Sequence, residues 1–142
     1  MATGIESRIL EGLLDHLSDL TLTPAMAVAW PDLHFDPPAA GYLRPSLAPN
    51  TATQVTLGTS GRNRYRGLFQ ISVFWPRNSG GIAPREKADL VAVHFKRGTT
   101  ISLTGGTIRI YRPPEIAATF PDDPYTHTPV TIYYQADFAN PS

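Results

Sequence analysis

The side chains best suited to acid–base or metal chemistry in this sequence are its histidines, and their spacing favours neither. They are His16, His34, His94 and His127. No two of them have the separation that places metal ligands side by side on a helix or strand, and there is no cysteine to complete a zinc site. His16 adjoins Asp15 and is close to Asp19, but residues three or four apart meet on any helix. We therefore expect a solvated helix face there, and a packing role for His94.

Motifs for nucleophilic or phosphate chemistry are also missing from the sequence. Residues 58–61, Gly-Thr-Ser-Gly, lack the spacing of a nucleophile elbow. The glycine pairs at 80–81 and 105–106 lack the lysine of a phosphate-binding loop. Asp122 and Asp123 are flanked by prolines, which favours a turn. The sequence therefore predicts no catalytic residue, no metal site and no bound cofactor, and so a protein that is not an enzyme.

One cluster of charged residues could form a binding surface. It consists of Arg62, Asn63, Arg64, Tyr65 and Arg66. Alternate residues of an extended chain share a face, so the three guanidinium groups could form a stripe on one side. Such a stripe could meet phosphates or the carboxylates of a partner. Alternatively, the same charges could simply protect an edge strand from unwanted pairing. Gly58 and Gly67 bound the cluster, so we expect an exposed turn.

The overall charge balance disfavours a dedicated nucleic-acid binder. The chain carries 12 basic and 12 acidic residues and has a formal net charge of zero, whereas nucleic-acid binders usually have a basic excess. Charged residues make up 17% of the chain, compared with about 25% in typical domains. A neutral surface with few charges offers little electrostatic resistance to self-association. This composition suits a protein that works inside an assembly.

The sequence also predicts a protein without a membrane partner. Its longest apolar run, residues 25–30, is far too short to span a bilayer. Acidic residues interrupt the first apolar segment, which is not the pattern of a secretory signal. We expect a soluble protein made in a cytoplasm.

Hydrophobic periodicity predicts two helices and several strands. Six residues recur at helical spacing near the start: Ile5, Ile9, Leu10, Leu13, Leu14 and Leu17. A second helix is expected between Pro84 and Gly98, with Ala88, Val91, Ala92 and Phe95 on its buried face. Residues 65–75 are predicted to form a central strand that is covered on both faces. Residues 99–111 are predicted to form a hairpin and residues 126–138 the last strand. Residues 42–47 are expected to form an edge strand, because Pro45 cannot donate a main-chain hydrogen bond. The predicted fold is α+β: a mostly antiparallel β-sheet packed against two α-helices in a single domain, residues 1–142.

The order of these segments resembles a known family. The resemblance is carried by Thr-Leu-Gly at 56–58, Arg-Tyr-Arg-Gly-Leu-Phe-Gln at 64–70, His-Phe-Lys-Arg-Gly-Thr at 94–99, Arg-Ile-Tyr-Arg-Pro-Pro at 109–114 and the closing strand at 129–138. These features are similar to those of the tail terminators, or tail-completion proteins, of long-tailed phages and prophages. The resemblance covers nearly the whole chain and includes no catalytic signature.

The resemblance implies a homohexameric ring that caps the tail tube, ends tube polymerisation and joins the tail to the head connector. The implied partners are other copies of the chain, the tail tube protein, the head connector protein and DNA that passes transiently and without specificity. The implied location is the virion tail, with assembly in the host cytoplasm. The family assigns no lumen residues by motif, so the cluster from Arg62 to Arg66 is a candidate interface or lumen surface on its own evidence.

Two alternative functions are compatible with the sequence. The chain could be another ring or tube component of the head–tail region of a phage. It could also be a small ligand- or nucleic-acid-binding module that uses the stripe from Arg62 to Arg66. A binding module has no need of a closed ring, so the mass in solution distinguishes it from a ring protein.

Overall fold

The computed structural model describes residues 4–22, 26–54 and 61–140. Two helices and eight strands occur in these ranges. In chain order they are α1 (Ile5–Ser18), β1 (Ala27–Val28), β2 (Tyr42–Gln54), β3 (Arg62–Pro76), α2 (Ile82–His94), β4 (Thr100–Leu103), β5 (Gly106–Ile110), β6 (Glu115–Ile116), β7 (Phe120–Asp122) and β8 (Tyr125–Ala139). The α+β class predicted from the sequence is thus the one observed.

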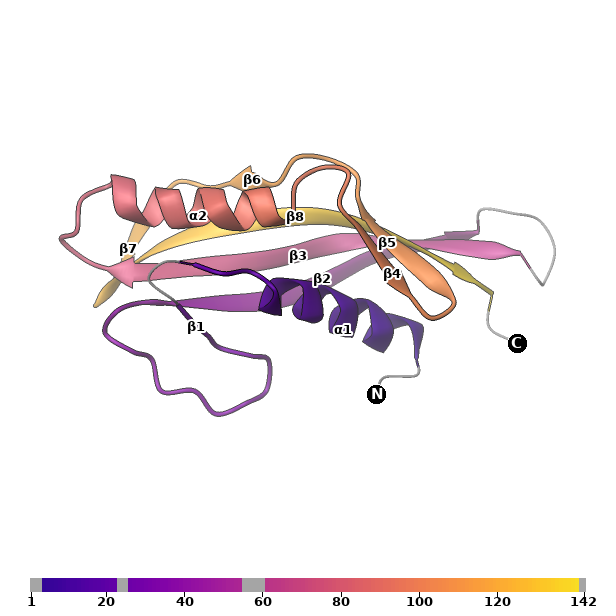
Figure 1. Ribbon diagram of the computed structural model, residues 1–142, viewed down its shortest axis with the longest axis horizontal. Helices are drawn as coiled ribbons and strands as arrows, with labels where there is room; N and C mark the ends of the chain where they lie inside the picture. The colour runs from indigo at the N-terminus through magenta and orange to yellow at the C-terminus, as the bar shows by residue number, and fades with distance from the viewer. Residues whose placement is uncertain (1–3, 23–25, 55–60, 141–142) are drawn as a thin grey trace.

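The strands form one mixed sheet in the order β1-β2-β3-β8-β5-β4, and β6 and β7 also pair with β8. β1 lies parallel to β2, whereas β2–β3, β3–β8, β5–β8 and β4–β5 are antiparallel. This corrects the expectation of a mostly antiparallel sheet. The direction of β1 could not be read from the sequence because a strand of two residues has almost no pattern of its own. β3 and β8 run along most of the length of the molecule (Figure 1).

Both helices pack on the same face of the sheet. Their inward residues are fully or almost fully buried: Ile9, Leu13 and Leu17 of α1, Ala88 and Val91 of α2, and Phe95, which directly follows α2. They meet the buried residues of β3 and β8 in one hydrophobic core that includes Phe69, Ile71, Val73, Val130, Ile132 and Tyr134. This confirms the predicted apolar faces of both helices. Neither helix in the described part of the chain is long and apolar enough to cross a membrane.

The other face of the sheet carries no helix within the described residues, and we call it the helix-free face. One end of it is covered by a second cluster, in which Ala29, Tyr42, Phe74 and Tyr125 are buried and Phe35 packs against them. The Tyr125 hydroxyl donates a hydrogen bond to the Pro38 carbonyl oxygen at 2.8 Å. Toward the other end of β3, residues such as Arg62 and Arg66 are exposed. The expectation that this strand is covered on both faces therefore holds only near Phe74.

The C-terminal ends of the two helices meet through their histidines. The rings of His16 and His94 stack with their centroids 4.1 Å apart, and both contact Phe95 edge-on. The expectation of a solvated His16 is wrong, because the ring of His94 at the end of α2 stacks on the His16 ring and leaves it partly buried.

Candidate assembly surface on the helix-free face

The cluster from Arg62 to Arg66 lies in a strand and not in the exposed turn that its flanking glycines predicted. Residues 58–60 of that expected turn lie outside the described part of the chain, and β3 already begins at Arg62. Because β3 is extended, its alternate side chains point to opposite faces. The side-chain amide of Asn63 donates a hydrogen bond to the side-chain oxygen of Asn140. The centre of the Tyr65 ring lies 6.3 Å from the centre of the ring of Phe138, a core residue. The three arginines of the cluster therefore point the other way, onto the helix-free face.

Each of these arginines contacts β8, the neighbouring strand. Arg64 lies directly opposite Asp137, and its Nε is 2.9 Å from a carboxylate oxygen of Asp137. Both side chains are about one-third exposed, so solvent screens this ion pair and its contribution to stability is small. Arg62 donates to the Asp137 carbonyl oxygen at 3.1 Å. Arg66 donates from Nε and Nη2 to the side-chain oxygen of Gln135 at 3.2 and 3.0 Å. These contacts hold the guanidinium groups in defined positions.

The positive charge of this surface extends beyond β3. On β2, β3, β5 and β8, as far as the structure describes them, the arginines of the helix-free face are Arg44, Arg62, Arg64, Arg66 and Arg109. Asp137 is the carboxylate among them, so these strands carry a formal excess of four positive charges on this face. Of the further acids, Glu115 on β6 pairs with Arg112, and Asp122 and Asp123 lie at the far end of the sheet. We call the five arginines the arginine face.

Tyrosine side chains add apolar area beside these arginines. The guanidinium carbon of Arg66 lies 5.3 Å from the centre of the Tyr111 ring. That of Arg112 lies 3.9 Å from the centre of the Tyr133 ring. Tyrosine and arginine are enriched in protein–protein interfaces, because both combine apolar area with directed hydrogen bonds.

Glu115 fixes the position of the second of these stacks. Its carboxylate accepts hydrogen bonds from the Tyr133 hydroxyl and from Arg112, both at 2.8 Å. The hydrogen bond from Tyr133 to Glu115 raises the pKa of that phenol, since it favours the protonated form. Side chains that are already ordered lose less conformational freedom on binding, so this part of the face is prepared for a contact.

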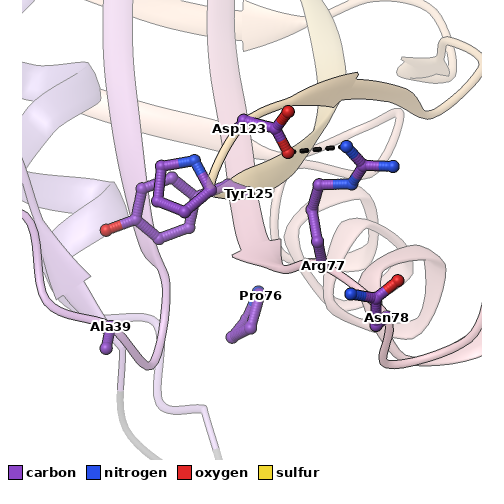
Figure 2. A pocket seen from close by; sticks show the side chains of 7 residues that line it. Ala39, Pro76, Arg77, Asn78, Asp123 and Tyr125 are labelled. Atoms are coloured by element: carbon purple, nitrogen blue, oxygen red, sulfur yellow. Dashed lines mark hydrogen bonds and ion pairs between the residues drawn. The ribbon is translucent and has the colours of Figure 1, made fainter.

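An open pocket of about 530 Å³ lies at the other end of the sheet (Figure 2). Its lining residues are Ala39, Pro76, Arg77, Asn78, Asp123, Pro124 and Tyr125. Figure 2 shows Arg77 reaching toward Asp123, and the two charged groups are 2.6 Å apart. Its opposite charges thus neutralise each other, which makes the pocket a weaker candidate than the arginine face. Among the described residues, no group of three or more His, Asp or Glu side chains could hold a metal ion.

Comparison with known proteins identifies the family. A family model described as phage tail terminator protein matches residues 8–134. The chain belongs to the phage tail terminator family. Proteins of this family are structural and not enzymatic, so the chain is a structural component of a phage tail.

Two solved structures resemble this family member over almost its whole length. One has 28% sequence identity and a TM-score of 0.76 over 94% of this chain and 96% of its own. The second comes from the virion of a native gene transfer agent particle. It has 15% identity and a TM-score of 0.58 over 97% of this chain and 99% of its own, which shows a shared fold. Among curated protein sequences, none matches significantly.

Sequence reasoning had singled out only part of the helix-free face. It selected Arg62, Arg64 and Arg66 because they alternate within a few residues, but it missed Arg44, Arg109 and the two tyrosines. Those residues come from other segments and reach the surface only when the strands pair. A signal was present in the last strand, where Tyr133, Gln135 and Asp137 alternate with apolar residues. This alternation could have placed these three side chains on the face of the arginines.

Proposed function

We propose that this tail terminator forms a homohexameric ring that caps the finished tail tube, ends tube polymerisation and joins the tail to the head connector. The match to the family model over residues 8–134 carries this proposal. The protein contacts copies of itself, the tail tube protein and the head connector protein, and performs no catalytic step. It assembles in the host cytoplasm and remains in the virion tail.

The edges of the sheet offer surfaces for such an assembly. β2 has thirteen residues, but β1 pairs with only Tyr42 and Leu43 of them. The rest of its outer edge has no partner strand among the described residues, and a row of unpaired main-chain groups is a template for contact with another chain. Pro45 removes one donor from this strand. The edge therefore favours an irregular contact between subunits over a continuous sheet.

The charge balance of the chain is compatible with the passage of DNA through the ring. Each phosphate contact strengthens binding to DNA, so a conduit made of strongly basic subunits would hold DNA in place. The net charge of this chain is zero. A ring of neutral subunits therefore allows the genome to slide from head to tail.

Electron microscopy of tails made with and without the protein tests the proposal. Without the terminator, we expect tubes of irregular, excessive length that do not join heads; with it, we expect tubes of uniform length with a ring at the end. Light scattering over a concentration series, with and without tail tube protein, should show a hexamer. Tails of normal length and normal head attachment in the absence of the protein would contradict its role as a terminator.

The positive excess on the arginine face favours one second candidate, a module that binds nucleic acid or another anionic ligand. Such a module would bind short double-stranded DNA as a monomer, with an affinity that falls steeply as salt rises.

A ring elsewhere in the head–tail region is a further alternative of the same structural class. Labelled particles distinguish that alternative, because the ring would then lie away from the junction of tube and connector.

A further inference from the structure

The outward side of α2 exposes an unusual amount of apolar surface. Ile82 is 75% exposed, Val93 64% and Leu90 44%, although all three are large aliphatic residues. Their spacing places them on one side of the helix, opposite the buried Ala88 and Val91. A helix with apolar residues on both sides is normally covered on both sides. The outward side of α1 is different, since its exposed residues are all polar: Glu6, Ser7, Asp15 and Ser18.

Two carboxylates lie among these aliphatic residues. Glu86 and Asp89 are exposed and belong to the same side of α2. Neither forms an ion pair with any residue that the structure describes. We call Ile82, Glu86, Asp89, Leu90 and Val93 the α2 ridge. It combines apolar area with unpaired negative charge.

The arginine face has the complementary properties. It carries excess positive charge, and the rings of Tyr111 and Tyr133 lie beside its arginines. It is on the helix-free side of the sheet, whereas α2 packs on the other side, so the two surfaces of one subunit face in opposite directions. We infer that the α2 ridge of one copy of the chain docks on the arginine face of the next copy. This inference rests on the proposed ring, for which it names the subunit interface.

Head-to-tail contacts between unlike surfaces are what a ring requires. A contact between two different patches of the same chain leaves one patch free at each end of the growing series, and a suitable rotation brings these two ends together and closes the ring. Part of the charge that balances the arginine face lies on the helix side: six of the twelve acidic residues are on or directly after the two helices, namely Glu6, Glu11, Asp15, Asp19, Glu86 and Asp89. Double-stranded DNA would complement the arginines but would leave the apolar ridge on α2 uncovered. A second copy satisfies both surfaces.

Charge reversal on each surface, followed by combination, tests the interface. Glu86→Lys/Asp89→Lys should weaken self-association at least about tenfold by placing like charges together, and Arg66→Glu/Arg109→Glu should do the same. The variant with all four changes should associate again, because opposite charges then face each other with the signs exchanged. Glu6→Lys/Asp15→Lys on α1 is the matched control and should associate like the parent. Sedimentation velocity gives the mass, and circular dichroism confirms that each variant is folded.

A second pair of substitutions tests the apolar part without a change in charge. Ile82→Ser/Val93→Ser removes two exposed aliphatic side chains, so thermal unfolding should hardly change while self-association weakens. If rings form only on the tail tube, the same variants are mixed with tubes, and the capped tube ends are counted in the electron microscope.

Each alternative result has a distinct meaning. If both single-surface variants associate like the parent, the interface is wrong while the ring remains. If both lose association and the combined variant does not recover it, the two surfaces meet different partners, and the pairing is wrong. If the arginine variant still forms rings but loses affinity for a short DNA duplex, the arginine face contacts DNA instead. A parent that forms no ring alone or on tail tubes would overturn the proposed function itself.

Discussion

His16 and His94 hold the ends of the two helices together through reciprocal hydrogen bonds. The Nε2 of His16 lies 2.8 Å from the His94 carbonyl oxygen, and the Nε2 of His94 contacts the His16 carbonyl oxygen. A carbonyl oxygen only accepts hydrogen bonds, so each Nε2 must carry the proton and donate it. Carbonyl groups in the last turn of a helix lack partners within the helix. Each ring thus donates a hydrogen bond to the main chain of the other helix while the rings stack, and the His16 carbonyl oxygen also accepts one from the Asp19 N–H at 3.2 Å.

We expect His16→Ala to lower the free energy of unfolding by about 1–2 kcal/mol, because it removes both a stacked ring and one of the two hydrogen bonds. The double variant His16→Ala/His94→Ala should cost less than the sum of the single variants, since the two residues act as a pair. Urea unfolding of the four proteins measures this coupling. His34→Ala, at an exposed histidine, is the control and should change stability by less than about 0.5 kcal/mol. Additive effects of the two histidines would show that the pairing contributes nothing.

Phe69 should be among the most costly residues to truncate. It is fully buried on β3, and the centre of its ring lies 5.7 Å from that of Phe95, which directly follows α2. Phe69→Ala should cost about 3–5 kcal/mol, because it removes buried apolar area and leaves a cavity between sheet and helix. Leu33→Ala is a suitable comparison, since Leu33 is 67% exposed. Equal unfolding midpoints for these two variants would mean that α2 does not pack on this face.

The sequence predicted the parts of the fold in which a long periodic pattern coincides with burial. α1, β3, β8 and the β4–β5 hairpin were predicted close to their observed bounds, because one apolar side repeats along each of them. The short strands β6 and β7 were too brief to show a period. The missed features are contacts between distant segments: Arg64 and Asp137 are 73 residues apart, and His16 and His94 are 78 apart. Such pairs depend on strand register and helix placement, which a local pattern does not contain.

Tyr134 should make the protein more sensitive to alkaline pH. Its hydroxyl is buried over Gly67 and has no hydrogen-bond partner among the described residues. Burial, with a smaller effect of the charge on Glu6, raises the pKa of this phenol from 10.0 to about 12. The unfolded chain therefore loses the proton first, and stability present below pH 10 falls as the pH rises toward 12.

Tyr134→Phe removes both the ionisable group and the unpaired hydroxyl. At neutral pH we expect this variant to match the parent or to be more stable by about 1 kcal/mol. Its advantage should grow by a further ~1 kcal/mol at pH 11, where the parent has lost part of its stability. Thermal unfolding at pH 7, 9 and 11 measures the difference, with Tyr111→Phe as a control at an exposed tyrosine. An advantage that shrinks with rising pH would contradict the assigned direction of the pKa shift.

The ion pair between Arg64 and Asp137 predicts that a charge reversal on this face has a structural cost as well as an effect on assembly. Because the two residues lie directly opposite each other on β3 and β8, Arg64→Glu places two carboxylates together and should cost about 1 kcal/mol. The exchange Arg64→Glu/Asp137→Arg re-forms the pair in the reverse order and should recover most of that loss, with the net charge unchanged. Urea unfolding in low salt and in 1 M NaCl tests this, since salt should reduce the penalty of the single variant.

If the exchange is no more stable than Arg64→Glu alone, the contact in the structure contributes nothing. An exchange that folds normally but associates less well than the parent would show that the position of this arginine, and not the charge of the face alone, matters in the ring.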